Sequence, residues 1–142
     1  MEKYLILAMF LMGVLPVIVS YIMFQRRISA LKRGEIKFDY FRTFQQNQNQ
    51  LDQKMVAANR NYTNLFEMPI LFFVVSLLFL VQKQVNEFVV FCAYFYVALR
   101  WGHTFIHLGS NKVKKRFLFF VASLLILLVM WIYLLGKIFL IS

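Results

Sequence analysis

The chain has 142 residues, of which 61% are hydrophobic and 15% are charged, and its formal net charge is +10. Soluble domains are usually about 45–50% apolar and about 25% charged, so this composition excludes a soluble domain and indicates a membrane protein. The basic residues lie between long apolar segments, which argues against a nucleic-acid partner and favours a role of the charge in membrane topology.

Four apolar segments are long enough to cross a bilayer, which requires about 20 helical residues. In chain order they cover residues 4–24, 56–81, 87–108 and 117–141. Barrel strands would alternate polar and apolar residues over about 10 positions, whereas these apolar runs are long and unbroken. The sequence therefore predicts an all-α membrane protein, a bundle of four transmembrane helices that forms a single domain over residues 1–142.

The connections between these segments differ in charge. The long first connection, residues 25–55, and the third connection, residues 109–116, together hold eleven lysines and arginines. The termini and the second connection hold only Lys3, Lys83 and Lys137. Because basic connections tend to stay in the cytoplasm, both termini are expected on the outer side of the membrane.

The first connection also carries an aromatic pattern. Phe38, Phe41 and Phe44 recur at every third position among polar residues. This spacing predicts a short helix that lies on the membrane surface, next to the lipid head groups.

The second apolar segment carries polar residues that a lipid-facing helix would not need. At about 100° per residue, Arg60, Asn64 and Glu67 lie on one face of a continuous helix. Pro69 follows, and its missing N–H leaves the Leu65 carbonyl without its usual helical partner. An ionisable residue inside a span is a candidate functional residue.

The third segment repeats this pattern. Tyr96, Arg100, His103 and His107 follow one another at spacings of four, three and four, so they also lie on one helical face. Arg116 begins the fourth segment at the same membrane depth. The simplest interpretation is a polar site between helices on the basic side.

Other interpretations remain open. Arg60 and Glu67 could pair with Arg100 or with each other and only lock the bundle, since a buried charge needs a partner. Arg60 and Arg116 could meet lipid phosphates. The two histidines have a spacing found in metal sites, but no His-Glu-x-x-His helix accompanies them, so no metal is expected. A proton relay through Glu67 and the histidines is a further alternative.

The side chains of this site favour a particular kind of ligand. Arginines bind carboxylates through paired, charge-assisted hydrogen bonds. A nearby carboxylate, here Glu67, can accept hydrogen bonds from an amine. The combination suits a zwitterion with several carboxylates, and glutathione is one such molecule.

At these residues the sequence resembles the MAPEG family, the membrane-associated proteins in eicosanoid and glutathione metabolism, and especially its bacterial branch. The likeness covers most of the chain and rests on the four spans, the basic first connection and two motifs. These motifs are Arg60-x-x-x-Asn64-x-x-Glu67, and Arg100-x-x-His103-x-x-x-His107 followed by Arg116. The resemblance implies a homotrimer in a bacterial inner membrane, with glutathione bound between subunits near the cytoplasmic side.

The resemblance also implies roles for the individual residues. Six would bind glutathione, namely Arg60, Asn64, Glu67, Arg100, His103 and His107. Arg116 matches the catalytic arginine that family enzymes place at the glutathione sulfur. A cation there lowers the pKa of the thiol and so favours the thiolate, which is the nucleophile.

Three positions depart from the family pattern. Phe117 and Phe120 stand where some family enzymes carry serine and tyrosine, and Tyr62 stands where relatives have histidine or glutamine. The binding residues are therefore better retained than the catalytic ones, and the isomerase activities of the family are not expected. The predicted function is glutathione binding with conjugation or reduction of a lipophilic substrate that enters from the bilayer. The alternative is a non-catalytic membrane interaction or lipid-binding protein.

Overall fold

The computed structural model describes residues 1–37 and 52–140, and every regular element in these ranges is a helix. The helices are α1 (Glu2–Lys32), α3 (Gln53–Leu65), α4 (Met68–Val81), α5 (Glu87–Leu108) and α6 (Val113–Leu140). Four helical stretches are long and apolar enough to cross a membrane, with α3 and α4 together forming the second. The predicted four-helix membrane fold is confirmed. The surface helix expected at Phe38, Phe41 and Phe44 lies outside the described residues.

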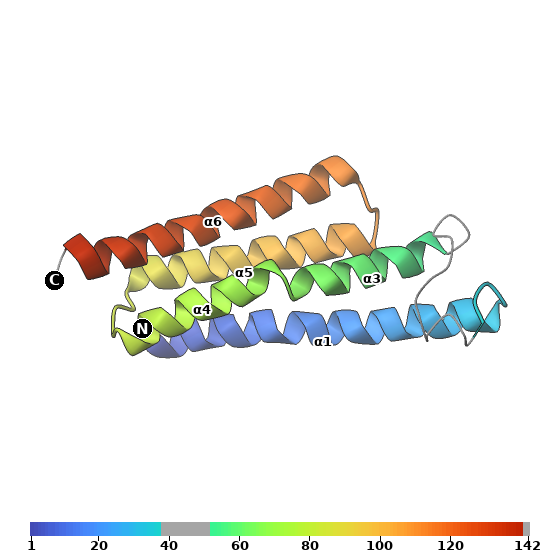
Figure 1. The fold of residues 1–142 in the computed structure, drawn as a ribbon, viewed down its shortest axis with the longest axis horizontal. Coiled ribbons are helices and arrows are strands. Elements are labelled where there is room, and N and C mark those ends of the chain that lie inside the picture. The colour runs from blue at the N-terminus through green and yellow to red at the C-terminus, as the bar shows by residue number, and fades with distance from the viewer. Residues whose placement is uncertain (38–51, 141–142) are drawn as a thin grey trace.

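The helices run side by side, and the start of α1 and the end of α6 lie at one end of the bundle (Figure 1). The opposite end holds residues 109–112, which connect α5 to α6, and the start of α3. We call this opposite end the basic end, because it holds described lysines and arginines of the first and third connections, among them Lys32, Lys54 and Lys112. The arrangement agrees with the four crossings expected from the sequence.

Two helices extend beyond the apolar segments that hydropathy delimits. α1 continues to Lys32 instead of ending near Phe24, and α6 begins at Val113 instead of Phe117. The added part of α1, residues 25–32, contains Gln, Arg, Ala, Leu and Lys, which are good helix formers. Helix propensity and side-chain contacts, rather than hydropathy, set these ends.

The structure divides the segment predicted as one helix over residues 56–81. The chain leaves helical geometry at Phe66 and Glu67, and α4 restarts at Met68. A continuous helix would need a hydrogen bond from residue 69 to the Leu65 carbonyl, and Pro69 has no N–H to donate. Proline is tolerated in the first turn of a helix, so α4 can begin directly before it.

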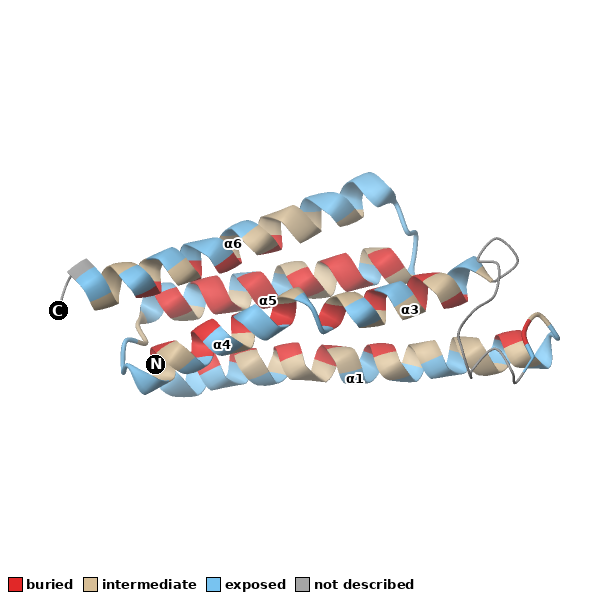
Figure 2. Cartoon of the chain, in the orientation of Figure 1, coloured by how far each residue is buried: buried red, intermediate tan, exposed pale blue. Residues whose placement is uncertain are grey.

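The buried side chains face the inside of the bundle, and α5 carries the most of them (Figure 2). α5 packs against α1, α3 and α6. Large apolar side chains such as Phe10, Val17, Phe91 and Phe139 are exposed on the outer surface. Such a surface is unfavourable in water but suits contact with lipid chains.

A glycine sets the distance between α5 and α6 near the basic end. A Cβ atom on Gly102 would overlap the ring of Phe119 on α6. The absence of a side chain at Gly102 therefore lets α6 approach α5 next to His103. This close approach brings the beginning of α6 within reach of the polar residues of α5.

At the end that holds the termini, Asn86 connects two helices. Its Oδ1 accepts from the Val89 N–H and caps α5, while its Nδ2 donates to the Tyr133 hydroxyl of α6 at 2.7 Å. We expect Tyr133→Phe to lower the free energy of unfolding by about 1 kcal/mol, the usual net value of one hydrogen bond. Thermal unfolding in detergent measures it. Tyr94→Phe is the control, because the Tyr94 hydroxyl forms no hydrogen bond within the described residues. An equal loss of stability in Tyr94→Phe would contradict the prediction.

Candidate functional site between helices α3, α5 and α6

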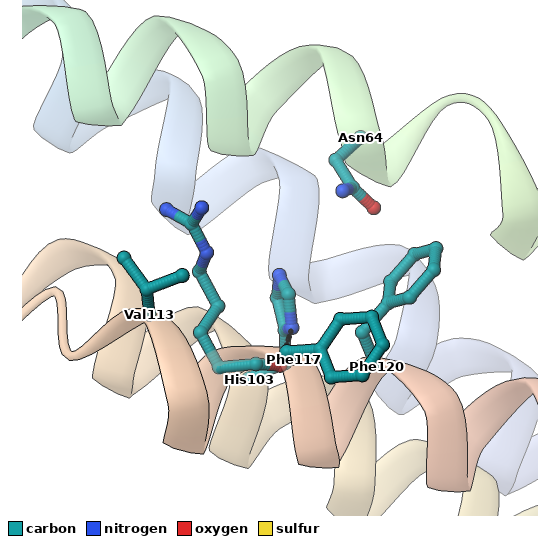
Figure 3. Close-up of a pocket in the computed structure, with 6 residues that line it drawn as sticks. Asn64, His103, Val113, Phe117 and Phe120 are labelled. Carbon is teal, nitrogen blue, oxygen red and sulfur yellow. Dashed lines mark hydrogen bonds between the residues drawn. The ribbon is translucent and has the colours of Figure 1, made fainter.

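A pocket of about 200 Å³ lies between α3, α5 and α6 in the half of the bundle nearer the basic end (Figure 3). Its lining residues are Asn64, His103, Val113, Arg116, Phe117 and Phe120. Asn64 reaches in from α3, His103 comes from α5, and the others come from the first two turns of α6. Three of the seven site residues predicted from the sequence, Asn64, His103 and Arg116, therefore line one cavity.

Arg100 is the most unusual side chain beside this pocket, because it is completely buried within a membrane-spanning helix. One guanidinium nitrogen, Nη2, donates to the side-chain oxygen of Asn64 at 2.8 Å and to its backbone carbonyl at 3.1 Å. Nε and Nη1 have no hydrogen-bond partner within the described residues. Buried polar groups are nearly always paired, so two unpaired donors on one buried cation indicate a missing acceptor.

The bond from Arg100 to the Asn64 carbonyl also explains how the helix break is tolerated. In a continuous helix, this carbonyl would accept from the N–H of Met68, four residues later. α3 ends at Leu65, so that bond is not formed within the helix. A carbonyl without a partner is costly inside a bilayer, and the positive charge of Arg100 also suits the negative end of α3. The break and the buried arginine therefore stabilise each other.

The face of Arg100 is covered by an aromatic ring. The guanidinium carbon lies 5.8 Å from the centre of the Phe120 ring, and the His103 ring centre lies 5.8 Å from the same ring. A cation over a ring face is attracted by the ring quadrupole. Phe120 therefore contributes an apolar wall with no hydroxyl group.

Arg116 contacts both histidines of α5. The backbone carbonyl of Arg116 lies 3.0 Å from Nδ1 of His103, and its Nη1 lies 3.2 Å from Nε2 of His107. Nη1 also donates to the Asn111 side chain at 2.8 Å. Asn111 adopts a positive φ of 48° in the turn between α5 and α6, a conformation that asparagine tolerates better than most residues. The turn and two helices together fix the guanidinium at the pocket.

Arg60 and Glu67 occupy a different position from the other five predicted residues. Both are exposed on the protomer, and neither lines the pocket. Glu67 follows the end of α3, so the continuous-helix geometry that placed it on one face with Arg60 does not apply. Arg100 bonds to Asn64 instead of forming a salt bridge with Glu67. The simple pairing of Arg100 with Glu67 considered for the sequence is therefore not seen among the described residues.

Two polar residues of the buried region were missed by the sequence analysis. Asn61 of α3 is fully buried, and its Oδ1 lies 3.5 Å from the Thr104 hydroxyl of α5, close to the limit for a hydrogen bond. Asn61 Nδ2 has no partner in the described part of the chain. Thr104 follows Arg100 by four residues, so helical spacing could have placed it on the same face.

Arg26 and Arg27, which the sequence analysis related only to membrane topology, also form hydrogen bonds to neighbouring helices. Arg26 of α1 donates to the Lys54 carbonyl at 2.7 Å and to the Leu108 carbonyl at 2.8 Å, near the start of α3 and the end of α5. The guanidinium of Arg27 donates twice to the Asn59 side-chain oxygen, at 2.9 and 3.1 Å. Charges at the basic end thus also connect helices of the bundle.

The site offers donors for an anionic ligand, namely the unpaired nitrogens of Arg100 and the guanidinium of Arg116. Hydrogen bonds between such charged donors and an anion are among the strong ones. The rings of Phe117 and Phe120 form an apolar part of the pocket wall.

The comparison with known proteins identifies one match. The model of the MAPEG family matches residues 4–136, which is nearly the whole chain and includes every residue of the pocket. No curated protein and no solved structure was found to match the chain.

Proposed function

Because the chain belongs to the MAPEG family, we propose that it binds glutathione at the pocket between α3, α5 and α6 and uses it to conjugate or reduce a lipophilic substrate. The protein is integral to a membrane. Glutathione enters from the cytoplasm at the basic end, in a bacterial inner membrane with both termini outside. The lipophilic substrate enters from the bilayer.

The observation that carries this proposal is the buried guanidinium of Arg100, in which Nη2 is hydrogen-bonded and Nε and Nη1 are not. A membrane protein that needed this cation only for packing would be expected to satisfy all of its donors, because an unpaired buried charge costs several kcal/mol. Two unpaired nitrogens on a buried cation favour a ligand that brings its own negative charge. A carboxylate of glutathione is such a group.

The other residues have complementary roles in this proposal. Asn64 and Arg100 hold a carboxylate, His103 and His107 contact the ligand, and the guanidinium of Arg116 stabilises the thiolate. The thiolate is the nucleophile that glutathione supplies when it is bound. Phe117 and Phe120 exclude water from this position.

Arg60 and Glu67 complete the site if a second subunit covers them. Both are exposed on the isolated protomer, yet they belong to a helix that otherwise spans the membrane. Charged residues at such positions are expected to face other protein or a ligand rather than lipid. We therefore propose that the protein is a homotrimer in which glutathione lies between subunits, with Arg60 and Glu67 at its polar ends.

Titration of the detergent-solubilised protein with glutathione tests the proposal. A ligand at about 100 times its Kd adds about 2.7 kcal/mol to the free energy of unfolding, so millimolar glutathione is expected to raise Tm clearly. The protein is also expected to conjugate glutathione with a generic aryl or alkenyl electrophile. No thermal stabilisation together with no conjugation would rule out the proposed function.

The runner-up is a non-catalytic membrane interaction or lipid-binding protein. The bonds of Arg26 and Arg27 to neighbouring helices support it, because they show basic side chains used for assembly. This function predicts thermal stabilisation by anionic lipid and none by glutathione, so the same titration with the two ligands separates the candidates.

A further inference from the structure

The two histidines of the site are held in opposite tautomers by one residue. A carbonyl oxygen only accepts hydrogen bonds, so His103 Nδ1, at 3.0 Å from the Arg116 carbonyl, must carry the proton. A guanidinium only donates, so His107 Nε2, at 3.2 Å from Arg116 Nη1, must be the unprotonated nitrogen. His103 is therefore left with an acceptor at Nε2, and His107 with a donor at Nδ1.

The free nitrogen of His103 is buried and faces the pocket. Nε2 has no hydrogen-bond partner in the described part of the protein, and it is shielded from solvent. In Figure 3, the dashed line joins the other ring nitrogen to the main chain of α6, and the remaining nitrogen points toward α3 on the side of Asn64. This buried, unpaired acceptor thus belongs to a side chain that lines the pocket together with Arg116.

From this geometry we propose that His103 is the proton acceptor for the thiol of the bound ligand, which rests on the function proposed above. The S–H bond breaks, an N–H bond forms at Nε2, and the sulfur keeps the electron pair beside the guanidinium of Arg116. The arginine cannot take this proton itself, because its guanidinium is already fully protonated. The structure therefore divides two tasks between two residues: His103 accepts the proton, and Arg116 stabilises the negative charge.

The surroundings of His103 determine what happens to the proton next. Among the residues that the structure describes, the charged or titratable groups near its ring are Arg100 and His107 on its own helix and Arg116 on α6. α3 contributes the uncharged Asn64 to the same pocket. The thiolate beside Arg116 balances the charge of the imidazolium until the electrophile binds. When a thiolate adds to an activated alkene, the S–C bond forms at one alkene carbon. The proton on Nε2 of His103 then passes to the other alkene carbon. This step balances atoms and charge without a further reactant.

Two substitutions separate proton transfer from ligand binding. In His103→Asn, the amide nitrogen can take the place of Nδ1 and keep the bond to the Arg116 carbonyl, but Nε2 is lost. In His103→Gln, an amide oxygen can approach the place of Nε2, but it cannot take a proton. Because His103 also contacts the ligand in the proposed function, both variants are compared with the wild type at saturating glutathione, with the Kd of each measured first. General-base catalysis commonly contributes about 10²–10⁴-fold, so addition to an activated alkene should slow at least about 100-fold.

The direct measurement is the ultraviolet absorbance of the bound thiolate as a function of pH. In both variants this absorbance should fall at neutral pH and recover only at higher pH. Unchanged absorbance in variants that still bind glutathione would overturn the role of His103 and leave the proposed function intact. Failure of the wild-type protein to bind glutathione would instead refute the proposed function.

Nitrogen NMR of the ligand-free protein gives a readout that does not depend on glutathione. With ¹⁵N-labelled histidine, His103 should show a protonated Nδ1 and an unprotonated Nε2, and His107 the reverse. His103→Asn and His107→Asn assign the two sets of signals. A protonated Nε2 on His103 would contradict the proposal, because that nitrogen could not then accept the proton.

Discussion

Replacing Arg116 by alanine is expected to abolish the thiolate absorbance of bound glutathione while weakening binding by less than about tenfold. Nη1 of Arg116 is already engaged by His107 and Asn111, so the guanidinium is held in place before any ligand binds. Loss of one hydrogen-bond donor that is fixed next to the developing negative charge commonly lowers the rate by about 10²–10³-fold. Conjugation of an activated alkene should therefore fall by at least about 100-fold, as measured with both substrates saturating.

The effect of Arg116→Ala should come from its position and not from the loss of a positive charge at the basic end. Lys115→Ala is the matched control, because it removes one charge from the adjacent residue, which is exposed and does not line the pocket. We expect it to keep both thiolate absorbance and rate. If Arg116→Ala retained the absorbance, or if Lys115→Ala lost it equally, Arg116 would not be the activating residue.

The second large effect is expected at Arg100. Arg100→Met keeps a long side chain in the buried position but removes the charge and all of its donors. We expect glutathione affinity to fall at least about 100-fold, because each hydrogen bond to a charged group contributes about 1.5–3 kcal/mol. Isothermal titration in detergent measures this loss.

The stability of the Arg100→Met variant should change much less than its affinity. Replacing a buried charge by an apolar side chain often stabilises a protein by about 1–4 kcal/mol, whereas leaving the oxygens of Asn64 unpaired costs about 1–3 kcal/mol. These opposing effects leave a net change within about 3 kcal/mol. A variant with wild-type affinity but a much lower Tm would show that Arg100 serves assembly.

Arg33→Met provides the control for the Arg100 experiment. Arg33 forms salt bridges with Glu35 and Asp52 near the ends of α1 and α3, outside the apolar spans. Its carboxylate partners raise its pKa above the ordinary arginine value, chiefly through the hydrogen bond to Glu35. The same substitution there should leave glutathione affinity unchanged, since Arg33 does not line the pocket.

The two expected effects separate binding from activation. Arg100 lies deeper in the protomer and has two unpaired nitrogens, which suits it to hold a ligand carboxylate. Arg116 stands at the beginning of α6, is partly exposed, and contacts both histidines. A loss of affinity in one variant and a loss of thiolate in the other would support this division, whereas equal losses of both in each variant would contradict it.

Several features of the fold could be predicted from the sequence because they depend on nearby residues. The four spans follow from the length of the apolar runs, and the faces of α3 and α5 follow from helical spacing. The break after Leu65 is also local, because Pro69 removes one specific hydrogen bond. The sequence analysis identified the unpaired Leu65 carbonyl, but it kept Glu67 on the same face as Arg60 and so did not anticipate the change of direction at Phe66 and Glu67.

The sequence by itself thus determined which segments cross the membrane and which polar residues they carry, because hydropathy and helical periodicity act over one or two turns. Only the tertiary structure decided which of these residues meet. Arg100 and Asn64 are 36 positions apart, and the backbone carbonyl of Arg116 reaches His103 only because Gly102 lets α6 pack closely against α5. These contacts between helices, and the histidine tautomers that follow from them, arise from packing that local spacing does not encode.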